Sequence, residues 1–311
     1  MAINPLVRAV LKALSDVSIN VKKHYRMERI LTRAAHPSLK FRYNMWNRKI
    51  VADGFSLPVR IFSPRQQRSR EIILFFHGGG WVSGDIESYT GVCADLARNT
   101  GRRVLSVDYR LAPEYPFPCG LEDCYRAARE LFLHGAASET AEDRIILMGD
   151  SAGGNLAAAV SLLAAGRGEF RVKRQILLYP LTYNDHTENS PFRSVSENGR
   201  DFLLTAKKIQ NYQELYIRSK EDLVSPYFAP LLSDHLEGQP KTLLITAEYD
   251  PLRDEGEAYG KKLRQYGNEV QIVRIRDALH GFFTFSSRLA QVRACYRLIN
   301  RFLEEAKDNE R

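Results

Sequence analysis

Short apolar runs alternate with helical stretches through most of this chain. The runs are rich in Ile, Leu and Val and have the length of buried strands. They lie at 71–76, 103–109, 145–147, 175–179, 242–246 and 270–275. Helical patterns lie at 121–133, 157–165 and 291–305. Strands that alternate with helices indicate βαβ units, so we expect an α/β fold with a mostly parallel central sheet flanked by helices.

A different pattern precedes these runs. Residues 40–62 alternate like two strands around the turn signal Asp53-Gly54, which favours an antiparallel pair leading into the parallel sheet. Before them, Leu6, Val10 and Leu14 recur at helical spacing with Lys and Arg between them. Such a stripe could lie on a membrane surface, but we expect it to pack on the protein itself.

The alternation of strand and helix is lost again in mid-chain, between residues 183 and 222. This stretch is polar at first and helical from 205 to 217, and an insert of its length between strands is usually functional or a lid. Several of its apolar side chains could line an acyl pocket, although packing on the core explains each of them and is preferred. They are Phe202, Leu203, Leu204, Tyr212 and Tyr216.

These patterns predict a core interrupted by one insert. We expect N-terminal cap helices at 1–40, the first part of an α/β core at 41–182, a cap insert at 183–222 and the second part of the core at 223–311.

Composition narrows the class of protein. The net charge is +8, but the basic residues are scattered and are not interleaved with aromatics, so a nucleic-acid partner is not expected. No apolar run is long enough to span a membrane, and we expect neither a signal peptide nor stable membrane insertion. No C-x-x-C pair occurs, and we expect four buried free thiols in a reducing, cytoplasmic environment. The cysteines are Cys93, Cys119, Cys124 and Cys295.

The candidate chemistry centres on a pentapeptide between a strand and a helix. Gly149-Asp-Ser-Ala-Gly153 fits G-x-S-x-G, follows the strand at 145–147 and precedes the helical stretch at 157–165. This context is that of a nucleophile elbow, a tight turn that presents one hydroxyl above the sheet. Ser151 is therefore the candidate nucleophile, and the N-terminus of the new helix would favour an oxyanion beside it.

A second glycine-rich turn follows the strand at 71–76. His77-Gly78-Gly79-Gly80-Trp81 matches the HGGG oxyanion loop of lipases and esterases. We expect the N–H groups of Gly78 and Gly79, with that of Ala152 after the serine, to form the oxyanion hole. The alternative is a phosphate-binding loop, but the P-loop and dinucleotide patterns are both absent.

A serine nucleophile also requires a base and an acid, and the sequence offers a candidate for each. Asp250 ends the strand that begins at 242 and precedes a helix, where the carboxylate of a triad would lie, while Asp254 is a rival that is better placed to pair within the helix start. His280 follows the last strand. The order Ser151, Asp250, His280 is that of α/β-hydrolases. For His77, at the start of the glycine loop, a positioning role is expected rather than proton transfer.

Five spaced motifs in this order resemble the hormone-sensitive-lipase-like family of α/β-hydrolases, also called fold-3. They are HGGGW (77–81), YRLAPE (109–114), GDSAGGN (149–155), YDPLRDEG (249–256) and HGF (280–282). The resemblance covers about residues 70–305 and implies a carboxylesterase with a helical cap, acting on short- to medium-chain acyl esters. The triad chemistry needs no metal or organic cofactor. The expected partner is a small-molecule ester, and a homodimer is possible on general grounds.

Two other functions use the same scaffold. A non-catalytic small-molecule receptor, as among plant relatives of the family, tends to lack the triad histidine, whereas this chain keeps His280. An amidase would use the same acyl chemistry, so the triad alone does not separate it from an esterase.

Overall fold

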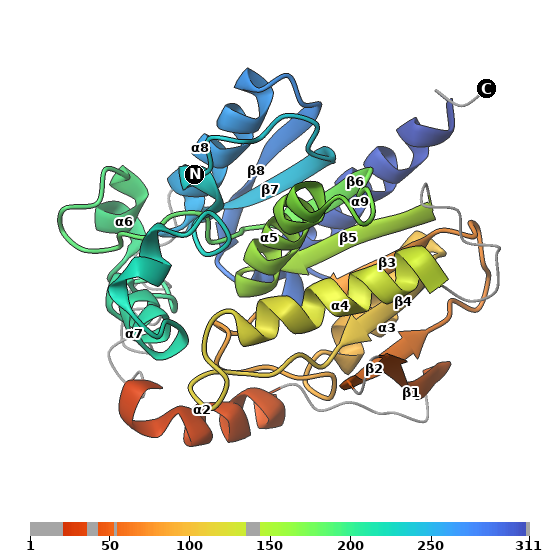
Figure 1. Ribbon diagram of the computed structural model, residues 1–311, viewed down its shortest axis with the longest axis horizontal. Coiled ribbons are helices and arrows are strands. Elements are labelled where there is room, and N and C mark those ends of the chain that lie inside the picture. The colour runs from red at the N-terminus through yellow and green to blue at the C-terminus, as the bar shows by residue number, and fades with distance from the viewer. Residues whose placement is uncertain (1–20, 36–42, 53–54, 135–143, 309–311) are drawn as a thin grey trace.

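A computed structural model describes residues 21–35, 43–52, 55–134 and 144–308. Within this part of the chain, a single sheet forms the centre of the molecule (Figure 1). Its strands are β1 (Met45–Ala52), β2 (Phe55–Phe62), β3 (Ile72–Phe76), β4 (Arg103–Val107), β5 (Ile145–Asp150), β6 (Arg174–Leu178), β7 (Lys241–Tyr249) and β8 (Val270–Leu279).

The order of strands across the sheet is β1-β2-β4-β3-β5-β6-β7-β8. β2 pairs antiparallel with both β1 and β4, and every pair from β4 to β8 is parallel. The predicted antiparallel pair leading into a parallel sheet is therefore confirmed. Because parallel strands end at the same edge, the loops after β3, β5, β7 and β8 meet on one side of the sheet.

Helices cover both faces of this sheet and extend beyond one side of it. They are α2 (Val21–Ala35), α3 (Thr90–Thr100), α4 (Cys119–His134), α5 (Ala152–Arg167), α6 (Arg193–Asn198), α7 (Ala206–Tyr216), α8 (Arg253–Gln265) and α9 (Ala290–Asp308). Short 3-10 turns lie at Lys220–Val224, Pro230–Leu232 and Phe282–Thr284.

The period-two alternation of strand side chains divides the core into two layers. On β3, Leu74 and Phe76 face the layer that contains α4, α5 and α8, while Ile73 and Phe75 face the layer that contains α3 and α9. All four side chains are fully buried. Figure 1 shows α4 and α5 lying across one face of the sheet. This two-sided burial explains why the strands consist of continuous apolar runs.

The cap insert and the N-terminal helix lie together beside the sheet, at the left of Figure 1. α6 and α7 fall inside the predicted insert at 183–222, and α7 packs against α2. Lys208 of α7 forms an ion pair with Glu28 of α2, with 2.8 Å between nitrogen and oxygen. The predicted helical stripe at Leu6, Val10 and Leu14 lies outside the described residues.

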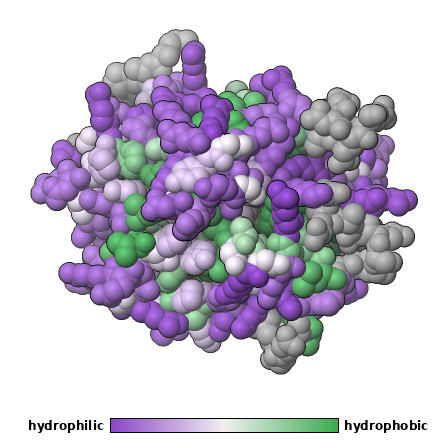
Figure 2. Space-filling view, turned by 45° about the horizontal axis from the view of Figure 1, so that its top comes forward, coloured by the Kyte–Doolittle hydropathy of each residue, from purple (hydrophilic) through white to green (hydrophobic). Residues whose placement is uncertain are grey.

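The surface in Figure 2 is mostly hydrophilic, with small apolar patches between polar side chains. None of the described helices is both long enough and apolar enough to cross a membrane. Three cysteines are free and buried, as predicted, but Cys119 at the start of α4 is only partly buried. The prediction for Cys119 was wrong because Cys119 is the first residue of α4, and its side chain is only partly covered there, whereas Cys124 further along the helix is fully buried.

Candidate active site

The turn between β5 and α5 has the strained geometry of a nucleophile elbow. Ser151 adopts φ 55° and ψ −119°, a conformation that L-residues rarely occupy. A Cβ on Gly149 would lie 2.1 Å from the carbonyl oxygen of Gly153, and a Cβ on Gly153 would lie 2.0 Å from that of Phe76. Both flanking positions therefore require glycine, because the turn brings backbone against backbone.

Three side chains from three loops form a continuous hydrogen-bonded chain at this edge of the sheet. The Oγ of Ser151 lies 2.8 Å from Nε2 of His280, and Nδ1 of His280 lies 2.8 Å from Oδ2 of Asp250. Asp250 is fully buried, and the side chain of His280 is 10% exposed. The arrangement gives the imidazole a carboxylate on one nitrogen and a hydroxyl on the other, which is the geometry of a nucleophile with its general base.

Asp254, the rival carboxylate, lies elsewhere. Its Oδ2 accepts the backbone N–H of Ser194 at 2.8 Å, and its Oδ1 pairs with Arg253. The other oxygen of Asp250, Oδ1, accepts the backbone N–H of Leu252 at 2.8 Å, which fixes the plane of the carboxylate.

The glycine loop after β3 lies beside the serine, but one of its N–H groups is already used. The N–H of Gly78 donates to Oδ1 of Asp150 at 2.9 Å and to the hydroxyl of Tyr89 at 3.1 Å. The expectation that Gly78 donates to an oxyanion is corrected by these contacts. Within the described structure, the N–H groups of Gly79, Gly80 and Ala152 make no hydrogen bond and are available as donors.

His77 holds the next peptide group of this loop. Its ring is fully buried and stacks on Tyr109, with 4.3 Å between ring centroids. Its Nδ1 lies 2.8 Å from the carbonyl oxygen of Gly78, so Nδ1 carries the proton and donates it. Burial lowers the pKa of His77, which keeps the ring neutral. Because C=O and N–H point in opposite directions across a trans peptide, this bond directs the Gly79 N–H away from the imidazole.

A second buried carboxylate adjoins the nucleophile. Asp150 precedes Ser151 directly and is 2% exposed. Burial raises the pKa of its carboxyl to about 6, although the hydrogen bonds from Tyr89 and Gly78 act in the opposite direction.

The cap insert contacts both the acid and the oxyanion side of this site. On α6, the side-chain amide of Asn198 donates to the backbone oxygen of Asp250 at 3.2 Å, and the hydroxyl of Ser194 donates to that of Pro251 at 2.8 Å. On α7, the ring of Tyr212 lies so close to Gly80 that a Cβ there would be 2.4 Å from it. The insert therefore covers the glycine loop directly.

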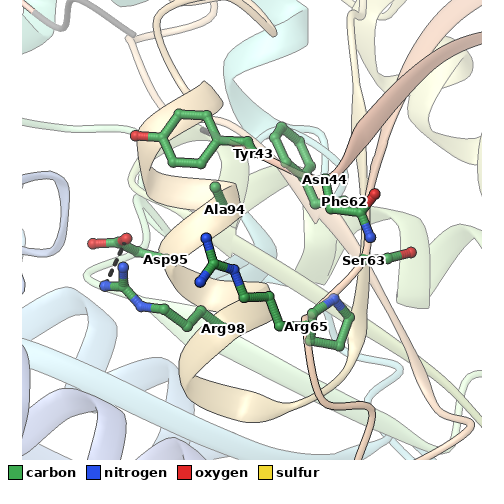
Figure 3. Close-up of a pocket in the computed structure, with 9 residues that line it drawn as sticks. Tyr43, Asn44, Phe62, Ser63, Arg65, Ala94, Asp95 and Arg98 are labelled. Carbon is green, nitrogen blue, oxygen red and sulfur yellow. Dashed lines mark ion pairs between the residues drawn. The ribbon is translucent and has the colours of Figure 1, made fainter. Parts of the chain in front are cut away.

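A cavity of about 650 Å³ lies away from this constellation. Figure 3 shows Tyr43, Arg65 and Arg98 around it. Its wall includes Phe62, which pairs with Val104 near the amino end of β4, whereas Ser151 follows the carboxyl end of β5. The cavity is therefore at the opposite edge of the sheet from the serine.

No group of three or more His, Cys, Asp or Glu side chains suited to a metal ion occurs among the residues that the structure describes. The polar groups at the site are those of acyl transfer: a hydroxyl, an imidazole, a carboxylate and free backbone N–H groups.

Comparisons with known proteins agree with this geometry. Residues 73–284 match the family model described as alpha/beta hydrolase fold. An arylesterase of Saccharolobus solfataricus is 36% identical over 237 residues, 75% of each protein. An ethyl acetate hydrolase of Pseudomonas putida is 35% identical over 239 residues, covering 76% of this chain and 74% of that protein. The solved structure of a hyperthermophilic esterase from Pyrobaculum calidifontis is similar over 99% of both chains, with a TM-score of 0.82 and 34% identity.

Two groups near the site were not singled out from the sequence. Asp150 lies inside the G-x-S-x-G pentapeptide, at a position the pattern leaves open, so only its neighbours in space reveal its contacts. The carboxylate of Glu255 is buried and accepts the N–H of Thr182 at 2.7 Å, while Nε2 of His186 lies 2.6 Å from it. This pair joins α8 to the start of the cap insert.

Proposed function

This chain belongs to the α/β-hydrolase fold family, within its hormone-sensitive-lipase-like esterases, and from that membership we propose a reaction mechanism for it as a serine carboxylesterase. Ser151 is the nucleophile, His280 the general base and then the general acid, and Asp250 the group that orients the imidazole. The observation that carries this proposal is the unbroken chain of two 2.8 Å contacts from hydroxyl to imidazole to buried carboxylate.

The reaction has two stages. His280 takes the proton of Ser151 as the oxygen attacks the ester carbonyl, and it returns that proton to the leaving alkoxide. Water, activated by the same imidazole, then hydrolyses the acyl-enzyme. Asp250 stabilises the imidazolium that forms in each stage.

The oxyanion of the tetrahedral intermediate is held by backbone N–H groups. We assign this role to Gly79 and Ala152, as the sequence suggested, and to Gly80 in place of Gly78. Support comes from the unused N–H groups at these three positions and from the bond that His77 makes to the Gly78 carbonyl. Loss of one such donor typically costs on the order of 100-fold in rate.

Short- to medium-chain acyl esters are the proposed substrates. Tyr212 of α7 contacts Gly80, so the cap insert packs directly on the glycine loop. Behind that loop, Trp81 stacks on Tyr216 with 4.4 Å between ring centroids, and both rings are buried. Aromatic side chains fill this region, which favours a compact acyl group over a long one.

A series of 4-nitrophenyl esters from acetate to palmitate tests the assignment. We expect turnover that is greatest at short or medium chain length and is lost in both Ser151→Ala and His280→Ala, since either change breaks the hydroxyl–imidazole pair. The kcat of each variant should be lower than that of the wild type by on the order of 10⁴-fold or more.

Two controls separate the alternatives. Turnover of a matching 4-nitroanilide as fast as that of the ester would favour an amidase. A folded wild-type protein that hydrolyses no ester and is not labelled at Ser151 by a fluorophosphonate would contradict the esterase and leave a receptor.

A further inference from the structure

The carboxylate of Asp150 is surrounded by three neutral donors from three elements that border the site. Its Oδ1 accepts the N–H of Gly78 at 2.9 Å, and its Oδ2 accepts the hydroxyl of Tyr89 at 3.0 Å. The hydroxyl of Tyr179 lies 3.5 Å from the same Oδ2. Gly78 follows β3, Tyr89 directly precedes α3, and Tyr179 directly follows β6.

These contacts connect Asp150 to both halves of the proposed machinery. Asp150 is joined to Ser151 by the chain itself and to the oxyanion loop by the Gly78 N–H. On the other side, the ring of Tyr179 packs edge-on against His280, with 4.9 Å between ring centroids. The carboxylate therefore lies beneath the place where nucleophile, base and oxyanion donors meet.

A buried carboxylate is costly to the fold unless its charge is compensated. Among the described residues, no Arg or Lys side chain hydrogen-bonds or pairs with Asp150, and its partners there are a backbone amide and two phenols. Groups kept in such unfavourable surroundings beside a nucleophile are typical of functional sites. A charged acceptor also binds an N–H about twice as strongly as a neutral one.

We propose that Asp150 is a positioning residue of the esterase reaction. Its ionised carboxylate holds Gly78 in the orientation that directs the Gly79 N–H at the ester oxygen. This inference rests on the proposed function. His77 holds the carbonyl side of Gly78 and Asp150 holds its amide side. Together they fix both peptide groups of Gly78. Displacing a donor by about 1 Å costs on the order of 100-fold in rate, so this orientation is required for catalysis.

Burial raises the pKa of Asp150 to about 6, so its ionisation can be followed by activity measurements on either side of that pH. The titratable groups that face it in the described structure are Tyr89, Tyr109, Tyr179, Cys93 and His280. Burial raises the pKa of the three phenols and of the Cys93 thiol, to about 12 for the thiol, so these four groups stay neutral. His280 is the base of the reaction itself.

Asp150→Asn is the variant that removes the charge and keeps an acceptor for the Gly78 N–H. It should behave at every pH as the wild type does when Asp150 is protonated. We expect kcat for 1-naphthyl acetate to be about 10-fold below wild type at pH 8, with KM little changed, since the weakened bond acts on the oxyanion donor. The ratio of the two kcat values should fall towards one as the pH drops through 6.

Tyr89→Phe keeps the carboxylate of Asp150 but shifts the pH at which it ionises. It removes a hydrogen bond that stabilises the carboxylate, so the pKa of Asp150 rises further. The decrease of kcat on lowering the pH should therefore begin at a higher pH in Tyr89→Phe than in wild type. This difference in pH dependence should disappear when both proteins also carry Asp150→Asn. A purely structural contribution of Asp150 would not move this pH dependence.

Glu71→Gln is the matched control, because Glu71 is also buried but lies at the amino end of β3, away from the serine. It should leave the pH dependence of kcat unchanged. A kcat ratio of wild type to Asp150→Asn that is the same at pH 5.5 and pH 8 would overturn the proposal, as would unchanged kcat in Asp150→Asn at pH 8. If Asp150→Asn proves unstable, the direction of the Tyr89→Phe shift decides alone.

Failure of the proposal and failure of the esterase assignment give different results. Active wild type with inactive Ser151→Ala, but no effect of Asp150→Asn, contradicts only the role of Asp150. Folded wild type without ester turnover contradicts the esterase itself.

Discussion

The residues around the reacting serine are constrained by distances between backbone atoms. Gly84 has φ +86°, and a Cβ there would lie 2.5 Å from the carbonyl oxygen of Gly78 and 2.7 Å from Nδ1 of His77. It therefore lies against the hydrogen bond between His77 and the carbonyl of Gly78, which holds the peptide group that ends in the Gly79 N–H. A single methyl group at this position tests how accurately the loop must be held.

Gly84→Ala should reduce kcat by on the order of 10- to 100-fold, because the methyl group displaces the Gly78 carbonyl and with it the oxyanion donor. Gly168→Ala is the control: Gly168 has a similar φ of +68°, but nothing lies within 4 Å of its Cβ position. Backbone strain should cost each variant about 1 kcal/mol in thermal unfolding, and Gly84→Ala should lose more because its methyl group also displaces the Gly78 carbonyl. Equal kcat in the two variants would contradict the assigned role of this contact.

Single residues could be selected from the sequence where the chemistry requires one particular residue type. Ser151, Asp250 and His280 could be selected because each follows a strand at the same edge of the sheet and because their order fits the fold. Which of three adjacent glycines donates to the oxyanion could not be predicted. That choice depends on the rotation of single peptide planes, and the Gly78 peptides are held by the side chains of Asp150 and His77, contacts that the sequence does not reveal.

The cap insert holds the loop that carries Asp250 through one short helix, α6, while Tyr212 of α7 lies against the glycine loop. α6 is six residues long, and its Asn198 and Ser194 hold the backbone of the loop that carries Asp250. This helix therefore braces the backbone of the loop that carries Asp250, the residue to which we assign the role of orienting the imidazole.

Asn198→Ala should reduce kcat about 3- to 10-fold and destabilise the fold by about 1–2 kcal/mol, because it leaves the buried oxygen of Asp250 without this donor. Ser196→Ala is the control on the same helix, since its hydroxyl bonds only to the neighbouring Arg193 oxygen among the described residues. Initial rates and urea unfolding measure the two effects. An Asn198→Ala enzyme with the kcat of Ser196→Ala would show that α6 does not position the acid.

Elements formed by periodic apolar residues could be predicted, and those formed by tertiary contacts could not. α6 reads RSVSEN, which contains no apolar repeat, and its ends are fixed by bonds to the Asp250 loop. β8 continues to Leu279, beyond the predicted end at 275, although Arg276 and Asp277 interrupt the apolar run. β8 is an edge strand, so charged side chains there can face solvent.

Over the whole molecule, the end of the sheet opposite the serine is held by a buried ionic cluster. Glu71 pairs with Arg102 and Arg174 at 2.5 Å each, and Arg102 also donates to the backbone of Leu303 in α9. The cluster therefore joins the amino ends of three strands to the last helix. Burial alone would raise the pKa of Glu71, but the two guanidinium groups lower it overall.

Glu71→Gln should destabilise the fold by about 3 kcal/mol at pH 7, because it leaves two buried guanidinium groups without their carboxylate. Since the pKa of Glu71 is lowered on folding, its stabilisation is present above about pH 4.5 and is lost as the pH falls below that value. Urea unfolding at pH 7 and at pH 3.5 measures the difference, which should shrink at low pH. A difference that is equal at both values would contradict the role of the ionised cluster.

The class of fold could be predicted because strands buried on both faces appear in the sequence as continuous apolar runs. In addition, several of the motif segments each follow one of these runs. The loss of strand–helix alternation predicts an insert at 183–222, and α6 and α7 lie within those bounds. Its contacts with the glycine loop did not follow, because Gly80 and Tyr212 lie far apart in the chain and meet only in the folded protein.

The most direct test of the mechanism is to detect the acyl-enzyme. Wild-type protein mixed with excess 4-nitrophenyl acetate and quenched in acid should carry one acetyl group on the peptide that contains Ser151, as measured by mass spectrometry, and Ser151→Ala should carry none there. Rapid ester turnover with no adduct on Ser151, or undiminished turnover by Ser151→Ala, would contradict it.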